Sequence, residues 1–258
     1  MGRIGLIFVV LLSLLGVYVQ GNAGDTFYDD LDILDVPYMA AIYLTKNGEE
    51  HGFLCNGVIL DPKTILTTAS CLVGTSAYNT IVRVGSSFAD RGGRQFKGFE
   101  LSIHPKYDPD FDNDIAILRI YPEMVLSSRI APVKLPEENS LLDGIVYGNY
   151  ITWSFSTTLT VAKMGLNTMS NTSCSVSYQS SYPRKELFTD RMICTSPSRF
   201  LCSHGPGSPF LVNDILYGLY SWTYRCDHPV VFTRVSAFIS WIDSVRSPII
   251  ETTMKPAD

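Results

Sequence analysis

The sequence predicts an all-β protein, either a sandwich or a barrel, with one helix near its C-terminal end. From Tyr38 onward, short apolar runs rich in β-branched and aromatic residues alternate with turn residues. Regularly spaced runs of this kind are typical of sandwiches and barrels. The composition, with 46% hydrophobic and 17% charged residues, is that of a globular chain able to bury a proper core.

The apolar runs define the expected strands, and one helical pattern follows them. Asn213-Asp214 separates the last two runs and predicts a hairpin turn. Apolar residues from Phe238 to Val245 recur at helical spacing, and Ser247-Pro248 ends that helix. The expected strands are residues 42–44, 53–60, 64–69, 80–84, 99–103, 115–120, 151–155, 159–163, 210–212 and 215–217.

Residues 1–23 have the pattern of a cleaved secretory signal. Arg3 provides a positive charge, an apolar run extends from Ile4 to Val19, and Gly21 and Ala23 are small residues suited to signal peptidase. A membrane anchor is the alternative, but the run is short for a membrane span and polar residues follow it at once. We therefore expect a secreted, extracellular protein without a membrane partner.

The charge balance disfavours several classes of partner. One of the 20 basic residues is Arg3, so the remaining chain has 19 basic against 25 acidic residues, a formal charge of −6. An acidic surface disfavours nucleic acids, heparin-like chains and anionic membranes. The four histidines are scattered, and neither a C-x-x-C pair nor an EF-hand spacing of oxygen ligands occurs. We therefore expect no metal and no cofactor.

The cysteines predict disulfide bonds. Their number is even, and all of them follow the signal segment, as in secreted proteins that are stabilised by disulfides. From the count alone, many connectivities remain open. The six are Cys55, Cys71, Cys174, Cys194, Cys202 and Cys226.

Several segments carry motifs that occur together in one family. The segment from His51 to Leu72 reads HGFLCNGVILDPKTILTTASCL, in which one cysteine opens a strand and another follows the next strand. In order and spacing, from about Pro37 to Ile242, the motifs resemble those of trypsin-like serine proteases of the chymotrypsin family. The others are Ile103-His104-Pro105-Lys106-Tyr107, Asn113-Asp114-Ile115-Ala116-Ile117-Leu118, Met192-Ile193-Cys194, Cys202-Ser203-His204-Gly205-Pro206-Gly207-Ser208-Pro209, Ser221-Trp222 and Phe232-Thr233-Arg234-Val235.

The resemblance implies two antiparallel six-stranded Greek-key β-barrels followed by a C-terminal helix. It also implies the pairing Cys55–Cys71, Cys174–Cys194 and Cys202–Cys226, with about 2–4 kcal/mol of stability from each bridge. The expected layout is a signal peptide at 1–23, an acidic lead-in at 24–36, a trypsin-like domain at 37–246 and a tail at 247–258. Within the domain, the barrels are expected at about 37–136 and 137–236 and the helix at about 237–246.

The same resemblance implies that the catalytic chemistry is lost. Acyl transfer in this family needs a serine nucleophile, a histidine base and an aspartate that orients the base. Here Pro206 occupies the nucleophile position, Ser70 the position of the base and Asp114 that of the aspartate. Proline has neither a hydroxyl nor a backbone N–H, and a serine hydroxyl accepts no proton near neutral pH. Asp114 is then expected to keep a structural role as a hydrogen-bond acceptor, with Ser70 as a donor.

The oxyanion hole and the substrate pocket are altered as well. Pro206 lacks the N–H that the nucleophile residue normally contributes, and the second donor position holds His204 where the family has glycine. The pocket positions are Phe200, Thr223 and Val230. Because Phe200 replaces the aspartate of trypsin-like enzymes and Val230 a frequent glycine, a narrowed or filled pocket is expected.

Activation by cleavage is also not expected. Gly205 stands where the family has the aspartate that binds the newly formed N-terminus. No Lys or Arg lies between Arg3 and Lys46, and no Ile-Val-Gly-Gly motif occurs. In the family, the new N-terminal amine and this aspartate form a buried ion pair, and here both partners are missing. The joint loss is coherent because either charged group would be costly to bury without the other.

Two positions have competing interpretations. His204, beside Ser203 and Ser208, could form a new nucleophile–base pair, although adjacency in sequence is poor evidence of triad geometry. Asn171 belongs to the one N-x-S/T sequon, so its glycosylation is expected in a secreted chain, and an unmodified surface asparagine is the alternative.

The sequence thus predicts a secreted pseudo-protease that acts as a monomer. It would bind an extracellular protein, such as a protease, a zymogen, an inhibitor or a receptor, through loops on a rigid scaffold. One alternative is a serine-type endopeptidase with a non-standard or residual active site. Another is a binder of small ligands or glycans, which the acidic charge disfavours.

Overall fold

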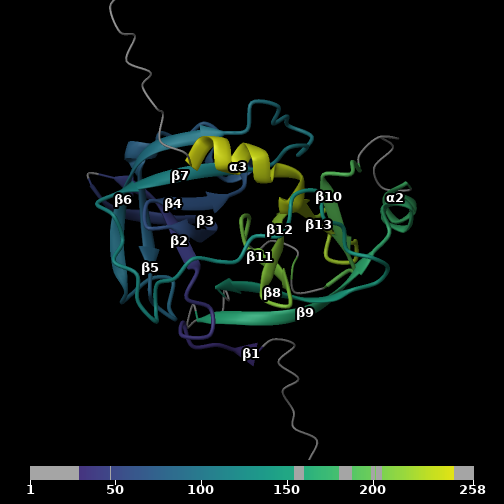
Figure 1. Ribbon diagram of the computed structural model, residues 1–258, viewed down its shortest axis with the longest axis horizontal. Helices are drawn as coiled ribbons and strands as arrows, with labels where there is room; N and C mark the ends of the chain where they lie inside the picture. Colours follow the sequence, from purple (N-terminus) through teal and green to yellow (C-terminus); the bar gives the residue numbers. More distant parts are fainter. Residues whose placement is uncertain are drawn as a thin grey trace, which may run out of the picture.

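The chain folds into two closed antiparallel barrels of six strands each, which lie side by side in Figure 1. This computed structural model describes residues 29–46, 48–153, 160–179, 188–198, 201 and 205–246. The all-β class and the two six-stranded barrels expected from the resemblance are confirmed. So is the helix at the C-terminal end.

The strands of the first barrel pair in the order β2-β3-β4-β7-β6-β5 and close on themselves. Ile42 on β2 pairs with Cys55 on one side and Val82 on the other, and all three are buried in the core of this barrel. A 3₁₀ turn, η1 (Ala77–Asn79), leads into β5. The strands are β2 (Met39–Lys46), β3 (Glu49–Asp61), β4 (Thr64–Thr67), β5 (Thr80–Val84), β6 (Arg94–Ile103) and β7 (Ala116–Tyr121).

In the second barrel, the strands are connected in the same order as in the first. Its strands pair in the order β8-β9-β10-β13-β12-β11, and β11 pairs back with β8. Asn213 and Asp214 join β11 to β12 with φ angles of 50° and 61°, as a type I′ turn requires, so the predicted hairpin is confirmed. The strands are β8 (Tyr147–Trp153), β9 (Val161–Met169), β10 (Met192–Thr195), β11 (Pro209–Val212), β12 (Ile215–Trp222) and β13 (Val230–Arg234).

One apolar cluster spans both barrels. Met39 and Leu66 of the first barrel belong to the same buried cluster as Trp153 and Leu219 of the second. Burial of this shared apolar surface, at about 25 cal/mol per Å², holds the two barrels in a fixed relation. Side chains at their junction are therefore positioned by both barrels.

The C-terminal helix further fixes the two barrels relative to each other. It follows η2 (Val235–Phe238) at the end of the second barrel, yet α3 (Ile239–Arg246) lies across the first barrel in Figure 1. Arg246 forms an ion pair with Asp61 of β3, with 2.9 Å between Nε and Oδ2. The guanidinium of Arg119 on β7 also donates a hydrogen bond to the carbonyl of Val245.

Two expectations from the sequence need correction. The strand expected at 64–69 is too long, because β4 ends at Thr67 and α1 (Ala69–Leu72) begins two residues later. The lead-in, which the aspartates from Asp25 to Asp35 predict to be exposed, is partly built into the fold. Its β1 (Asp29–Asp30) pairs with β9, and the apolar residues Ile33 and Val36 that follow are buried in the shared cluster.

The helix α2 (Asn171–Tyr178) was not expected either. Its residues are mostly β-branched or small and polar, so intrinsic propensity is weak. Ser170 caps the helix by accepting a hydrogen bond from the backbone N–H of Ser173 at 3.1 Å. Cys174 and Tyr178 are buried, so contacts with the barrel hold the helix in place.

Candidate functional site

Two of the predicted triad positions, Ser70 and Asp114, meet at the junction of the barrels, where Asp114 is fully buried. Ser70 on α1 donates two hydrogen bonds to its carboxylate, from the backbone N–H to Oδ1 at 2.6 Å and from the hydroxyl to Oδ2 at 2.8 Å. The hydroxyl of Ser221 on β12 of the second barrel also donates to Oδ2. Asp114 thus acts as the acceptor for Ser70, as expected, and for a residue across the junction.

Local structure explains why Ser70 lies beside Asp114. Ser70 is in the short helix that directly follows β4, and Cys71 is tied to Cys55 of β3 by a disulfide with 6.1 Å between the Cα atoms. Asp114 directly precedes Ile115 and β7, the strand that pairs with β4. The segments after β4 and before β7 therefore lie together at one end of the first barrel.

The electrostatics of Asp114 suit an acceptor and not the partner of a base. Burial raises the pKa of its carboxyl above the ordinary value, and the hydrogen bonds from Ser221 and Ser70 oppose that shift. Both serine hydroxyls point their protons at the carboxylate. Neither hydroxyl is basic enough to accept a proton from a nucleophile near neutral pH. The arrangement of Ser70, Ser221 and Asp114 therefore lacks a general base.

No histidine replaces the missing base among the residues that the structure describes. His104 packs its ring against Phe238 and Trp241 of the C-terminal segment, with 5.2 and 5.1 Å between ring centroids. Burial lowers the pKa of its imidazole. His228 pairs with Asp227 in a loop of the second barrel, at 2.8 Å between Nδ1 and Oδ1.

Pro206, at the predicted nucleophile position, contributes only a carbonyl to this region. That carbonyl accepts a hydrogen bond of 2.9 Å from the backbone N–H of Asn56 on β3. The flanking residues Gly205 and Gly207 have φ angles of +84° and +80°, a backbone conformation that favours glycine. The ring of Pro206 has no group that could attack a carbonyl or bind an oxyanion.

A buried polar cluster of Asn56, Thr152 and Ser208 lies beside Gly205 and joins the barrels. The Asn56 side-chain amide donates to the Ser208 hydroxyl at 2.8 Å, and that hydroxyl donates to Thr152 at 3.1 Å. A Cβ atom added to Gly205 would lie 2.5 Å from the Ser208 hydroxyl and 2.6 Å from the Asn56 amide. The space next to Gly205 is therefore filled, and no side chain fits there without displacing this cluster.

One of the predicted pocket positions, Val230, lies in the buried apolar core of the second barrel. Val230 is buried in one cluster with Tyr220, Leu201 and Phe232. The hydroxyl of Tyr220 donates to the carbonyl of Leu201 at 2.9 Å, which fixes the ring among these residues. At the third pocket position, the hydroxyl of Thr223 donates to the Pro229 carbonyl at 3.0 Å.

Some of the predicted site residues lie outside the described part of the chain. These are Phe200, His204, Ser203 and Cys202. Ser208, the other serine considered as a replacement nucleophile, is fully buried and bonded within the polar cluster. It is therefore inaccessible to a substrate carbonyl.

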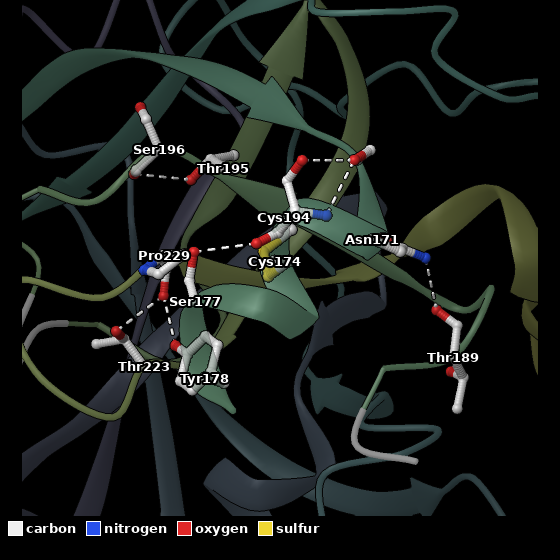
Figure 2. The surroundings of a disulfide bond; sticks show 12 residues. Asn171, Cys174, Ser177, Tyr178, Thr189, Cys194, Thr195, Ser196, Thr223 and Pro229 are labelled. Atoms are coloured by element: carbon white, nitrogen blue, oxygen red, sulfur yellow. Dashed lines mark hydrogen bonds between the residues drawn. A yellow bond between two sulfur atoms is a disulfide. The ribbon is translucent and has the colours of Figure 1, made fainter. Parts of the chain in front are cut away.

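Two of the three implied disulfides are confirmed. Besides Cys55–Cys71, the bridge Cys174–Cys194 joins α2 to β10 with 6.3 Å between the Cα atoms, as Figure 2 shows. The third includes Cys202, which is not among the described residues. Asn171 is exposed at the start of α2, and its side-chain amide donates to the Thr189 carbonyl at 3.3 Å.

The described residues offer no evident binding site for a metal ion. They contain no group of three or more His, Cys, Asp or Glu side chains that could hold one. Over the same residues, no helix is both long and apolar enough to cross a membrane.

Sequence comparison links the chain to proteins named trypsins. The family model described as Trypsin matches residues 29–242. The chain is 28% identical to trypsin Blo t 3 of Blomia tropicalis over 83% of each chain. It is 27% identical to trypsin beta of Drosophila erecta, over 91% of this chain and 97% of that protein.

Two solved structures share the fold. The chain matches the scabies mite inactivated protease paralogue S-D1 with a TM-score of 0.74 and 20% identity, over 84% of this chain and 94% of that one. It matches the scabies mite inactivated protease paralogue S-I1 with a TM-score of 0.72 and 23% identity, over 84% of this chain and 97% of that one.

Proposed function

The chain belongs to the trypsin family, and from this membership we propose that it is a secreted, catalytically inactive homologue that acts by binding another extracellular protein. The hydrogen bonding of Ser70 supports this proposal most directly. At the position that the resemblance assigns to the base, the side-chain hydroxyl donates a hydrogen bond to Asp114 and has no lone pair basic enough to activate a nucleophile.

The expected loss of rate is very large. In a related triad, removal of the nucleophile or of the base alone lowers kcat by roughly a million-fold. Pro206 also cannot supply the backbone N–H of an oxyanion hole. Loss of one such donor lowers kcat by about 10²–10³-fold. Little catalysis over the uncatalysed reaction would remain.

Substrate binding and activation fit the same proposal. Val230, at a predicted pocket position, is buried in one cluster with Tyr220, which supports a narrowed pocket that does not admit a basic or large side chain of a substrate. The polar cluster fills the space beside Gly205, where the family has the aspartate of the activation ion pair. The two mite proteins of the same fold are described as inactivated protease paralogues, which is a precedent for a non-catalytic use of this scaffold.

Without catalysis, the function that this scaffold can still perform is binding of another protein. Loops carried by two fixed barrels form a stable surface, and loss of catalysis leaves that surface intact. The acidic charge favours a protein partner over nucleic acid or an anionic membrane. We therefore assign the partner to the class of proteases, zymogens, protease inhibitors or receptors of an extracellular pathway.

Labelling with a fluorophosphonate tests the loss of catalysis. The purified secreted protein should take up no label under conditions in which an active trypsin is labelled completely. Covalent labelling of the intact protein that disappears in a His204→Ala variant would contradict the proposal and support an endopeptidase with a non-standard site.

Affinity capture from the native secretion tests the binding role. The folded protein used as bait should retain a specific extracellular protein, and bait unfolded by reduction should not. If no partner is retained at bait concentrations that saturate micromolar affinities, the recognition function is wrong.

A further inference from the structure

A groove on the second barrel lies away from the triad positions. It has a cavity volume of about 820 Å³, and neither Ser70, Asp114 nor Pro206 lines it. Residues 141–145, residues 168–171 and Ser173 line it, together with Met192, Ile193 and Cys194 of β10. This volume falls within the range of about 300–1,000 Å³ that suits small ligands.

Two of the side chains that line the groove are large, apolar and exposed. Leu141 is 65% exposed and Ile145 is 78% exposed. Neighbouring exposed apolar side chains of this kind offer surface that an occupant of the groove can cover. The backbone beside Ile145 is fixed, because the backbone N–H of Val146 donates to the Thr168 hydroxyl at 2.7 Å and that hydroxyl donates to the Gly144 carbonyl at 3.3 Å.

Two of the three charged side chains that line the groove, those of Arg234 and Asp190, are already bonded within the protein, and the third, Asp143, is exposed. The guanidinium of Arg234 donates to the carbonyls of Asp190 and Ser140. The carboxylate of Asp190 pairs with Arg191 at 3.0 Å. The groove therefore offers apolar surface with a few polar groups at its edge, a surface that suits an amphipathic occupant better than an ionic one.

An attachment point for such an occupant lies in the same groove. Asn171 lines the groove, is exposed, and is the acceptor asparagine of the sequon completed by Ser173. Its side-chain Nδ2 carries two hydrogens, one of which bonds to the Thr189 carbonyl (Figure 2). Glycosylation replaces one hydrogen and leaves the other, so this bond can persist and direct the glycan.

We propose that Asn171 carries an N-linked glycan whose first N-acetylglucosamine residues lie in this groove and cover Leu141 and Ile145. The proposal rests on the secretion proposed above. The donor is a lipid-pyrophosphate-linked oligosaccharide of the secretory pathway. A bond forms between Nδ2 and the sugar C1, the bond from C1 to the lipid pyrophosphate breaks, and Nδ2 loses one proton. The acetyl methyl groups and C–H faces of the sugar rings then pack on the aliphatic side chains.

Peptide mapping of the protein secreted by a eukaryotic cell line tests the modification. We expect a hexosamine-containing mass at Asn171 that an N-glycan-releasing enzyme removes. Asn171→Gln and Ser173→Ala should both abolish it, whereas Ser173→Thr, which preserves the sequon, should keep it. Unmodified Asn171 in secreted protein would overturn the inference and leave secretion standing. Unmodified protein that is retained inside the cell would overturn both the glycosylation inference and the proposed secretion.

Carbene footprinting tests the position of the glycan. Enzymatic removal of the glycan from the folded wild-type protein should raise labelling of Leu141 and Ile145 several-fold. Labelling of Val125, which is 67% exposed and lies outside the groove, should not change. Equal labelling of the two groove residues before and after removal would overturn the covering role, and no variant has to fold for this comparison.

Discussion

Alanine at Gly205 should destabilise the protein much more than alanine at Gly74. Both glycines have a φ angle in the left-handed region, +84° and +79°, so each substitution places a side chain in a conformation that costs about 1–2 kcal/mol. At Gly74 the added Cβ meets no atom within 4 Å. At Gly205 it would lie 2.5, 2.6 and 2.8 Å from atoms of Ser208, Asn56 and Thr152.

The close contacts at Gly205 add a cost of overpacking. Forcing extra atoms into a well-packed interior typically costs about 1–3 kcal/mol. We therefore expect Gly74→Ala to lower the free energy of unfolding by about 1–2 kcal/mol and Gly205→Ala to lower it by about 2–5 kcal/mol. Adding Ser208→Ala to Gly205→Ala should recover part of the loss, because it removes the nearest of the three contacts.

Urea unfolding monitored by tryptophan fluorescence, with the disulfides intact, measures these differences. The slopes of the free energy against denaturant should agree among the variants, so that midpoint shifts report stability. Equal destabilisation by the two alanine substitutions would refute the view that a packed polar cluster occupies the space beside Gly205.

Three further predictions follow from the site. The stability of Asp114→Asn relative to that of wild type should increase from acid to neutral pH, which urea unfolding at several pH values measures. Burial raises the folded pKa of Asp114, so its stabilising contribution is fully present below the unfolded pKa and is lost as pH rises through the folded value; a pH-independent difference would contradict this. A Ser70→His, Gly205→Asp, Pro206→Ser variant should not cleave basic peptide amides, because the pocket stays narrowed; robust cleavage would overturn the pocket interpretation. Replacing both cysteines of Cys174–Cys194 with serine should cost about 3 kcal/mol of unfolding free energy, given a loop of 20 residues, and no change in the urea midpoint would contradict this.

Features that depend on local chemistry could be predicted from the sequence. Asn213-Asp214 predicts a type I′ turn because both residues tolerate positive φ, and the hairpin there is present. The motif that contains Asp114 correctly indicated a buried acceptor for Ser70. The order of the motifs identified both the fold and the pairing of Cys55 with Cys71, since each motif occupies a defined place along the chain.

Features that depend on contacts between distant segments were missed. Asn56 gave a weak signal, a polar residue inside an apolar strand, but its partners Thr152 and Ser208 are far along the sequence and belong to the other barrel. Tyr220 has no local signal that connects it with the pocket positions, and only the packing of the barrel brings it into one buried cluster with Leu201 and Val230.

The helix α2 was missed for the same reason. Its own residues do not favour a helix, and the sequence offers no local signal for it. The structure shows that the disulfide from Cys174 to Cys194 and the burial of Tyr178 stabilise it, both through contacts with the second barrel. Tertiary contacts of this kind override propensity and cannot be read from a short window of sequence.

Hydrolysis of a proteome-derived peptide library by the purified secreted protein, followed by mass spectrometry, tests the loss of catalysis most directly. We expect no new peptide termini above those in a sample without the protein, even after prolonged incubation. New termini with a defined sequence preference that a serine-directed inhibitor suppresses would contradict the proposed function.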